Sequence, residues 1–204
     1  MEVSSRQDTK AELLRSAERL IAERGIGSVS VKMITTDAGA RNPSAVHYHF
    51  GSIEGLIREV FTQKYRAIEA ERAVRLQRVD ESDPNARVVA LIEAAIGPFM
   101  EACLEESGRM YVSFALQFGT DPRFDLSQST VEAGLESLLW LRGELVSCLP
   151  HVPPDKLVSR MRHSFMISLV QAADYAGKVE AGTAPPIEDA VKDAATCIAA
   201  YLGA

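Results

Sequence analysis

The stretch GARNPSAVHYHFGSIEGL, residues 39–56, carries the features that decide the fold. It opens on glycine, passes through an Arg-Asn-Pro turn and places two histidines around a tyrosine. On an α-helix, residues two positions apart point about 200° away from each other, so His47 and His49 cannot bind one metal ion. No Cys, Asp or Glu stands at ligand spacing, and no nucleophile–base pattern accompanies them. We therefore expect no metal site, no catalytic site and no enzyme activity.

The helix predicted within this stretch has two different faces. The polar face carries Ser44, His47 and Tyr48, and the other face carries Val46, His49 and Phe50. A short helix of this kind, following another short helix through a glycine turn, is typical of a helix-turn-helix motif. In that motif the second helix enters the major groove of DNA. The same residues could merely cap and pack a small three-helix bundle, and the pattern alone leaves both interpretations open.

Cap signals on either side predict four helices before residue 80. The first begins at the N-cap Thr9 and carries an apolar stripe at helical spacing. Short helices follow from the N-caps Ser30 and Asn42, and Pro43 takes the first helical position of the second of them. A long fourth helix begins at Ser52.

The rest of the chain predicts five longer helices separated by Pro, Gly and Asp. They cover about 85–105 with a break or kink near Gly97–Pro98, then 108–117, 129–149, 155–177 and 187 to the end. No segment alternates like a strand. We therefore expect an all-α protein of about nine helices.

Composition is that of an ordinary globular protein, with 47% apolar and 25% charged residues among 204. The net charge of −6 arises beyond residue 60, because residues 1–60 hold equal numbers of basic and acidic groups. A DNA contact must therefore come from local arrangement rather than from a basic surface.

With no membrane-length apolar run and no secretory signal, we expect a cytoplasmic protein without membrane contact. Cys103, Cys148 and Cys197 are expected to be reduced, buried thiols.

Residues 9–65 resemble the DNA-binding domain of the TetR/AcrR family of bacterial transcriptional repressors. The resemblance lies in LLRSAERLIAERGIGSVSV, ITTDAGA and VHYHFGSIEGL. It implies a DNA-binding domain at 7–67, with the helix-turn-helix at about 31–50, and a helical ligand-binding and dimerisation domain at 68–204. Many relatives have lysine where this chain has Ile53, at the start of the fourth helix, so that phosphate contact is lost.

The resemblance also implies a function. We expect a homodimeric repressor that binds a palindromic operator in double-stranded DNA and is released by a hydrophobic small-molecule effector, with no cofactor. Effector binding would tilt the fourth helix and move the two reading heads out of register. The candidate DNA contacts are Arg41, Asn42, Pro43, Ser44, Ala45, His47, Tyr48 and His49. The alternative is a helical ligand-binding or adaptor protein that no longer reads DNA.

Two further residue sets are candidates for the second domain. Aromatic and sulfur-containing residues that could line an effector pocket are Phe99, Met100, Tyr111, Phe114, Phe118, Trp140, His163 and Met166. Stripes on the last two helices that could form a four-helix dimer interface are Leu157, Met161, Phe165, Ala172, Ile187, Val191, Ala194 and Ile198. Both sets also fit an ordinary intrachain core.

Overall fold

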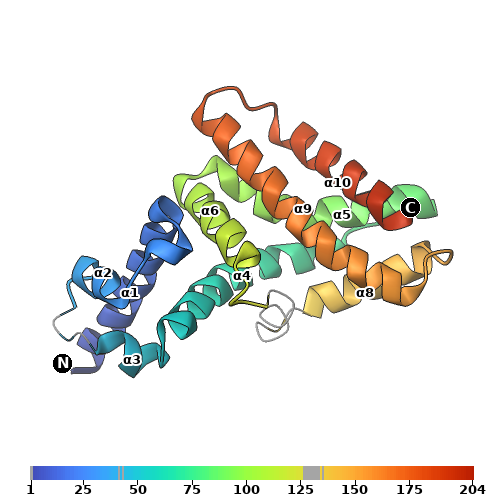
Figure 1. Ribbon diagram of the computed structural model, residues 1–204. Helices are drawn as coiled ribbons and strands as arrows, with labels where there is room; N and C mark the ends of the chain where they lie inside the picture. Colours follow the sequence, from blue (N-terminus) through green and yellow to red (C-terminus); the bar gives the residue numbers. More distant parts are fainter. Residues whose placement is uncertain (1, 41, 43, 126–133, 135) are drawn as a thin grey trace.

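The structure is a computed structural model that describes residues 2–40, 42, 44–125, 134 and 136–204. Nine α-helices and two 3-10 turns form this described part of the chain, which contains no strand. The prediction of an all-α fold is confirmed. Figure 1 shows the first three helices gathered at one end and the last two lying side by side in the larger part of the molecule. No helix in these ranges is long and apolar enough to cross a membrane.

The head of the molecule consists of three helices around a small apolar core. They are α1 (Glu2–Arg24), α2 (Val31–Asp37) and α3 (Ala45–Phe50), with the 3-10 turn η1 (Ile26–Ser28) after α1. The apolar stripe of α1 is buried, with at most 3% exposure, at Leu13, Ala17, Leu20 and Ile21. Ile34 of α2 and Val46 of α3 are fully buried in the same cluster, so all three helices share one core.

Local chemistry sets most helix ends in the head. The Ser30 hydroxyl accepts the Met33 N–H at 3.3 Å and caps α2, as predicted. Gly39 after α2 and Gly51 after α3 have φ angles of 61° and 75°, in the left-handed region that favours glycine. Both glycines therefore end their helices as the sequence indicates.

Two predicted helix starts are wrong. Helix α1 begins at Glu2 rather than after Thr9, because no proline or glycine in residues 2–8 stops the helix from extending. Helix α3 begins at Ala45 rather than after Asn42. The Asn42 Oδ1 accepts the Ser44 N–H at 2.9 Å, which forms a turn in front of the helix instead of a cap.

Helix α4 (Ile53–Gln77) connects the head to the rest of the molecule (Figure 1). The Ser52 hydroxyl accepts the Gly55 N–H at 3.0 Å, as predicted for its N-cap. Gly55 lies so close to α3 that an added Cβ would stand 2.2 Å from the Phe50 carbonyl oxygen. The start of α4 is thus fixed directly against the end of α3.

We expect Ser52→Ala to lower the free energy of unfolding by about 1 kcal/mol, because the Gly55 N–H loses its acceptor. Urea unfolding followed by circular dichroism measures this change. Ser52→Asp is the matched control, since aspartate also caps a helix. Equal losses in the two variants would show that the cap does not stabilise α4.

Five further α-helices form the larger part of the molecule. They are α5 (Pro84–Glu101), α6 (Glu106–Thr120), α8 (Glu136–Cys148), α9 (Pro154–Glu180) and α10 (Ile187–Gly203), with the 3-10 turn η2 (Ala102–Leu104) after α5. Helix α10 packs on α5 and α9, and α6 packs on α9 and on α1 of the head. The predicted helix at 129–149 is described only from Glu136, and residues 129–133 and 135 lie outside the described ranges.

Of the break or kink predicted near Gly97–Pro98, the break is wrong. Helix α5 continues through Pro98 and ends at Glu101, so less than one turn follows the missing N–H. The Asp83 carboxylate caps its start by accepting the Ala86 N–H at 2.8 Å. Both Gly97 and Pro98 are buried, which indicates that the proline is retained by packing.

Aromatic stacking and polar contacts join the head to the larger domain. Phe61 of α4 stacks on Phe118 of α6 with ring centroids 4.5 Å apart. Gln117 of α6 donates from Nε2 to the Ile21 carbonyl at 2.9 Å, and its Oε1 accepts the Ile26 N–H at 2.7 Å. Helix α6 therefore holds the end of α1, far away in sequence.

The prediction of three buried thiols is correct only for Cys103. Burial raises the pKa of Cys103 to about 11, and its thiol lies 3.5 Å from the Ala172 carbonyl oxygen. Cys148 is half-buried and Cys197 is exposed. The exposed position of Cys197 follows from its place on the outer side of α10.

Candidate DNA-binding surface and ligand pocket

The exposed face of α3 carries the polar residues identified in the sequence. Ser44 and His47 are exposed, and Tyr48 has 69% of its surface exposed, while Val46 is fully buried. His49 is half-buried, with its ring centroid 5.0 Å from that of Tyr48. The α2–turn–α3 unit thus presents one hydrogen-bonding face to the outside.

The other candidate DNA contacts are not all on this face. Asn42 is exposed, but Ala45 is only 6% exposed because its side chain packs into the core of the head. Ala45 therefore packs in the core and does not lie on the exposed face where a contact with a base was expected. Arg41 and Pro43 lie outside the described residues.

His47 has one ring nitrogen already engaged. Its Nδ1 lies 2.7 Å from the Gly51 carbonyl oxygen, which can only accept, so Nδ1 carries the proton. This contact satisfies a carbonyl at the end of α3 and fixes the ring, leaving Nε2 available at an exposed position. Among the described residues, no three His, Cys, Asp or Glu side chains lie close enough to hold a metal ion.

An ion pair fixes α2 to α1 in the head. Arg19 donates to Asp37 and to Glu23, and the pKa of Asp37 is lowered by hydrogen bonds from Arg19 and Ser16. These charges stabilise the relative position of two helices. The Arg19 guanidinium is therefore engaged within the chain.

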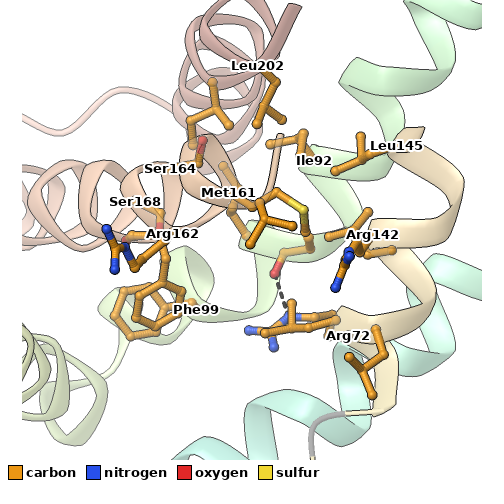
Figure 2. A pocket seen from close by; sticks show the side chains of 18 of the residues that line it. Arg72, Ile92, Phe99, Arg142, Leu145, Met161, Arg162, Ser164, Ser168 and Leu202 are labelled. Atoms are coloured by element: carbon orange, nitrogen blue, oxygen red, sulfur yellow. Dashed lines mark hydrogen bonds between the residues drawn. The ribbon is translucent and has the colours of Figure 1, made fainter. Parts of the chain in front are cut away.

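The larger domain contains a cavity of about 620 Å³ between α4, α5, α8, α9 and α10. Figure 2 shows its side chains converging from these helices. Its walls are mostly apolar, with a few polar and charged groups. The lining residues are Tyr65, Arg72, Ile92, Ala95, Ile96, Phe99, Gly134, Glu136, Leu138, Leu139, Leu141, Arg142, Leu145, Asp155, Val158, Ser159, Met161, Arg162, Ser164, Phe165, Ser168, Ile198 and Leu202.

Of the eight residues predicted to line an effector pocket, only Phe99 lines this cavity. Four of the others, with at most 3% exposure, belong to the core: Met100, Tyr111, Phe114 and Phe118. Trp140 is 42% exposed on α8, and exposed His163 contacts the Tyr201 hydroxyl at 2.8 Å. Met166 packs half-buried against the core. For four of the eight residues the ordinary intrachain core, which the sequence also allowed, is therefore correct: Met100, Tyr111, Phe114 and Phe118.

The predicted dimer stripes also lie inside the chain. Five of the eight residues have at most 8% of their surface exposed: Leu157, Ala172, Val191, Ala194 and Ile198. Met161 and Phe165 line the cavity, and Ile187 packs half-buried against the core. The stripes are buried because α9 and α10 pack on α5 and α6 with these faces.

A buried polar network lies where α4 meets the cavity. Arg72, 3% exposed, donates from Nε to the Ala95 carbonyl at 2.9 Å and from Nη1 to the Tyr65 hydroxyl at 3.0 Å. The same Nη1 donates to Glu69 at 2.9 Å. Glu69 in turn accepts the backbone N–H of Ser137 at 2.9 Å and its hydroxyl at 2.7 Å. Glu69 thus ties the start of α8 to α4.

Sequence reasoning missed this network. Desolvation raises the pKa of the Tyr65 hydroxyl, and the Arg72 guanidinium stacks 4.9 Å from the Tyr65 ring centroid. The available signal was an arginine seven residues beyond Tyr65, two turns along the same face of α4. An arginine on the buried face of a helix requires hydrogen-bond partners, and such a residue marks a polar site.

A helix-turn-helix head joined by one long helix to a larger helical part is an arrangement typical of DNA-binding transcription regulators. Residues 13–60 match the family model of the bacterial regulatory proteins of the tetR family. This stretch, about a quarter of the chain, is similar to that family.

Two solved structures share the fold over almost the whole chain. A protein from Shewanella sp. PV-4, assigned to the tetR family of transcription regulators, is 17% identical, covers 90% of this chain and 93% of its own, and has a TM-score of 0.60. A transcriptional regulator from Rhodococcus sp. RHA1 is 20% identical, covers 93% and 95%, and has a TM-score of 0.56. No curated protein sequence matches the chain.

Proposed function

We propose that this protein is a homodimeric repressor that binds a palindromic operator and is released by a small molecule bound in the 620 Å³ cavity. One observation carries the proposal: α4 begins against the end of α3 and contributes Tyr65 and Arg72 to the cavity wall. A single helix therefore contacts both the DNA-reading surface and the cavity. The proposal divides the chain into a DNA-binding domain at 7–67 and a ligand-binding and dimerisation domain at 68–204, in the cytoplasm.

In this proposal the exposed face of α3 reads DNA. Ser44 stands before the first turn, where a helix-turn-helix meets base edges, and its hydroxyl can donate or accept. Tyr48 and the free Nε2 of His47 can contact flanking phosphates, which fixes the register of the helix. The start of α4 offers backbone N–H groups to a further phosphate, although Ile53 supplies no charge there.

In this proposal, ligand binding in the cavity and DNA binding by α3 are coupled by one free energy, which acts equally in both directions. A ligand that favours one arrangement of α4 lowers DNA affinity by about 1–3 kcal/mol, and DNA weakens the ligand by the same factor. The Arg72–Glu69–Ser137 network supports this route, since it links α4 to α8, a wall of the cavity.

The dimer surface in this proposal is the outer face of α9. Val170 is 55% exposed, and Gly177, two turns along, is exposed with no atom within 4 Å of an added Cβ. Met166 and Ala173 continue the same stripe at helical spacing, half-buried. Small and apolar residues on one helix face allow close packing against a second copy.

We expect Val170→Glu to raise the dimer dissociation constant at least tenfold, because two-fold symmetry places a pair of like charges in one interface. Sedimentation velocity across a concentration series measures this. Val146→Glu is the matched control, since Val146 is also exposed but lies on α8. A dimer unaffected by Val170→Glu would place the interface elsewhere.

The experiment that tests the function is selection of the purified protein against random duplex DNA. Recovery of a palindromic motif, bound with an affinity that falls steeply with salt, supports a dimeric sequence-specific regulator. A folded protein that recovers no motif favours the alternative, a helical ligand-binding or adaptor protein that no longer reads DNA. Repression itself is tested by a reporter gene placed behind the recovered motif.

A further inference from the structure

The cavity wall contains a buried cation with unused donors. Arg72 uses three of its five N–H donors, one on Nε and two on Nη1. The two donors of Nη2 have no acceptor among the described residues, although the side chain is only 4% exposed. Because Arg72 lines the cavity, a ligand bound there can supply the acceptor that these donors lack.

A second cation lines the same part of the cavity. Figure 2 shows Arg142 of α8 and Arg72 of α4 on one side, with Leu202 and Ser164 away from them. Arg142 is exposed and has no ion-pair or hydrogen-bond partner within the described ranges. With Arg162 included, three arginines line the cavity against two carboxylates, those of Glu136 and Asp155. Glu69 pairs with Arg72 from behind the wall, so the charge available to a ligand there comes from Arg142 and from the remaining donors of Arg72.

Much of the remaining wall is apolar, although Arg162, Asp155 and three serines also belong to it. Its apolar part includes Leu145, Met161, Ile198 and Leu202. The volume of about 620 Å³ lies within the range of roughly 300–1,000 Å³ that holds drug-sized ligands. The cavity therefore combines the Arg72–Arg142 pair with a large apolar surface.

We propose that the ligand is an amphipathic organic acid: its carboxylate accepts from Arg72 Nη2 and pairs with Arg142, and its apolar body fills the remainder. This inference rests on the proposed function in taking the cavity as the effector site. A carboxylate suits the two guanidinium groups because charge-assisted hydrogen bonds are roughly twice as strong as neutral ones.

The acid group of the ligand also acts on the hydrogen bonds that join α4 to α8. Glu69 pairs with Arg72 and holds the N–H and hydroxyl of Ser137 at the start of α8. A second carboxylate at Arg72 shares the cation with Glu69 and weakens that pairing. The charge of the ligand therefore acts on the connection between α4 and α8.

The experiment uses Trp140, the single tryptophan of the chain, on the cavity-wall helix α8. The full-length protein is titrated with decanoate, dodecanoate and 4-phenylbutyrate, and with the methyl ester of each, while its fluorescence is recorded. We expect at least one acid to bind at least tenfold more tightly than its ester. In Arg142→Ala that preference falls at least fivefold, whereas Arg66→Ala, an exposed arginine on α4 outside the cavity, retains it.

Three outcomes overturn the inference: esters that bind as tightly as acids, an Arg142→Ala variant with an unchanged preference, or no acid that binds. Operator binding is measured separately on each variant without ligand. A protein that binds its operator but prefers esters refutes the acid ligand and keeps the proposed function. A protein that prefers acids but binds no operator does the reverse.

Discussion

Tyr48→Ala is expected to weaken operator binding by about 100-fold and to leave the fold and the cavity intact. The ring is 69% exposed, so its loss removes no core packing. A hydrogen bond to a charged phosphate contributes about 1.5 kcal/mol, and a dimer loses two such bonds. A loss of about 3 kcal/mol corresponds to roughly 100-fold in affinity. Fluorescence anisotropy with the selected operator measures it.

Two controls make this result specific. Tyr48→Phe removes only the hydroxyl, and a comparable loss identifies the hydrogen bond rather than ring contact. Leu104→Ala, which also truncates an exposed apolar side chain but on η2, is expected to change operator affinity less than twofold. Unchanged operator binding by Tyr48→Ala would remove Tyr48 from the DNA-reading surface.

Arg72→Leu is expected to lower the free energy of unfolding by about 3–5 kcal/mol, because it leaves the Glu69 carboxylate without its cation. The Tyr65 hydroxyl and the Ala95 carbonyl lose a donor at the same time. The side chain of Glu69 is 14% exposed, so solvent replaces the lost partner poorly. Urea unfolding at neutral pH measures the change.

The same substitution at Arg66 is the matched control. Arg66 lies on α4 as well but is exposed, so Arg66→Leu is expected to change stability by about 0.5 kcal/mol or less. Glu69→Gln in the Arg72→Leu background removes the uncompensated charge and is expected to recover part of the loss. A stable Arg72→Leu single variant would show that the network is not needed to hold α4 in place.

Features set by local chemistry could be predicted from the sequence. The caps at Ser30 and Ser52 and the turns at Gly39 and Gly51 depend on residues at most four positions apart. Asn42 failed as a predicted cap because its side chain has two local uses, a cap or a turn, and the sequence does not choose between them.

The cavity could not be predicted, because it depends on how far apart α8 and α9 lie. Phe114 and Phe118 are aromatic, as expected of residues that line a pocket, yet they lie in the core. Leu139 and Leu145 on α8 were not among the residues predicted to line a pocket, yet both line the cavity. A single sequence gives the apolar face of each helix and not the space left between the helices.

The hydrogen bonds of Gln117 to the end of α1 restrict how the head can move relative to α6. The head is attached through α4 and, separately, through the bonds of Gln117 to Ile21 and Ile26. A displacement of α4 relative to α6 must therefore either break those bonds or carry α6 along.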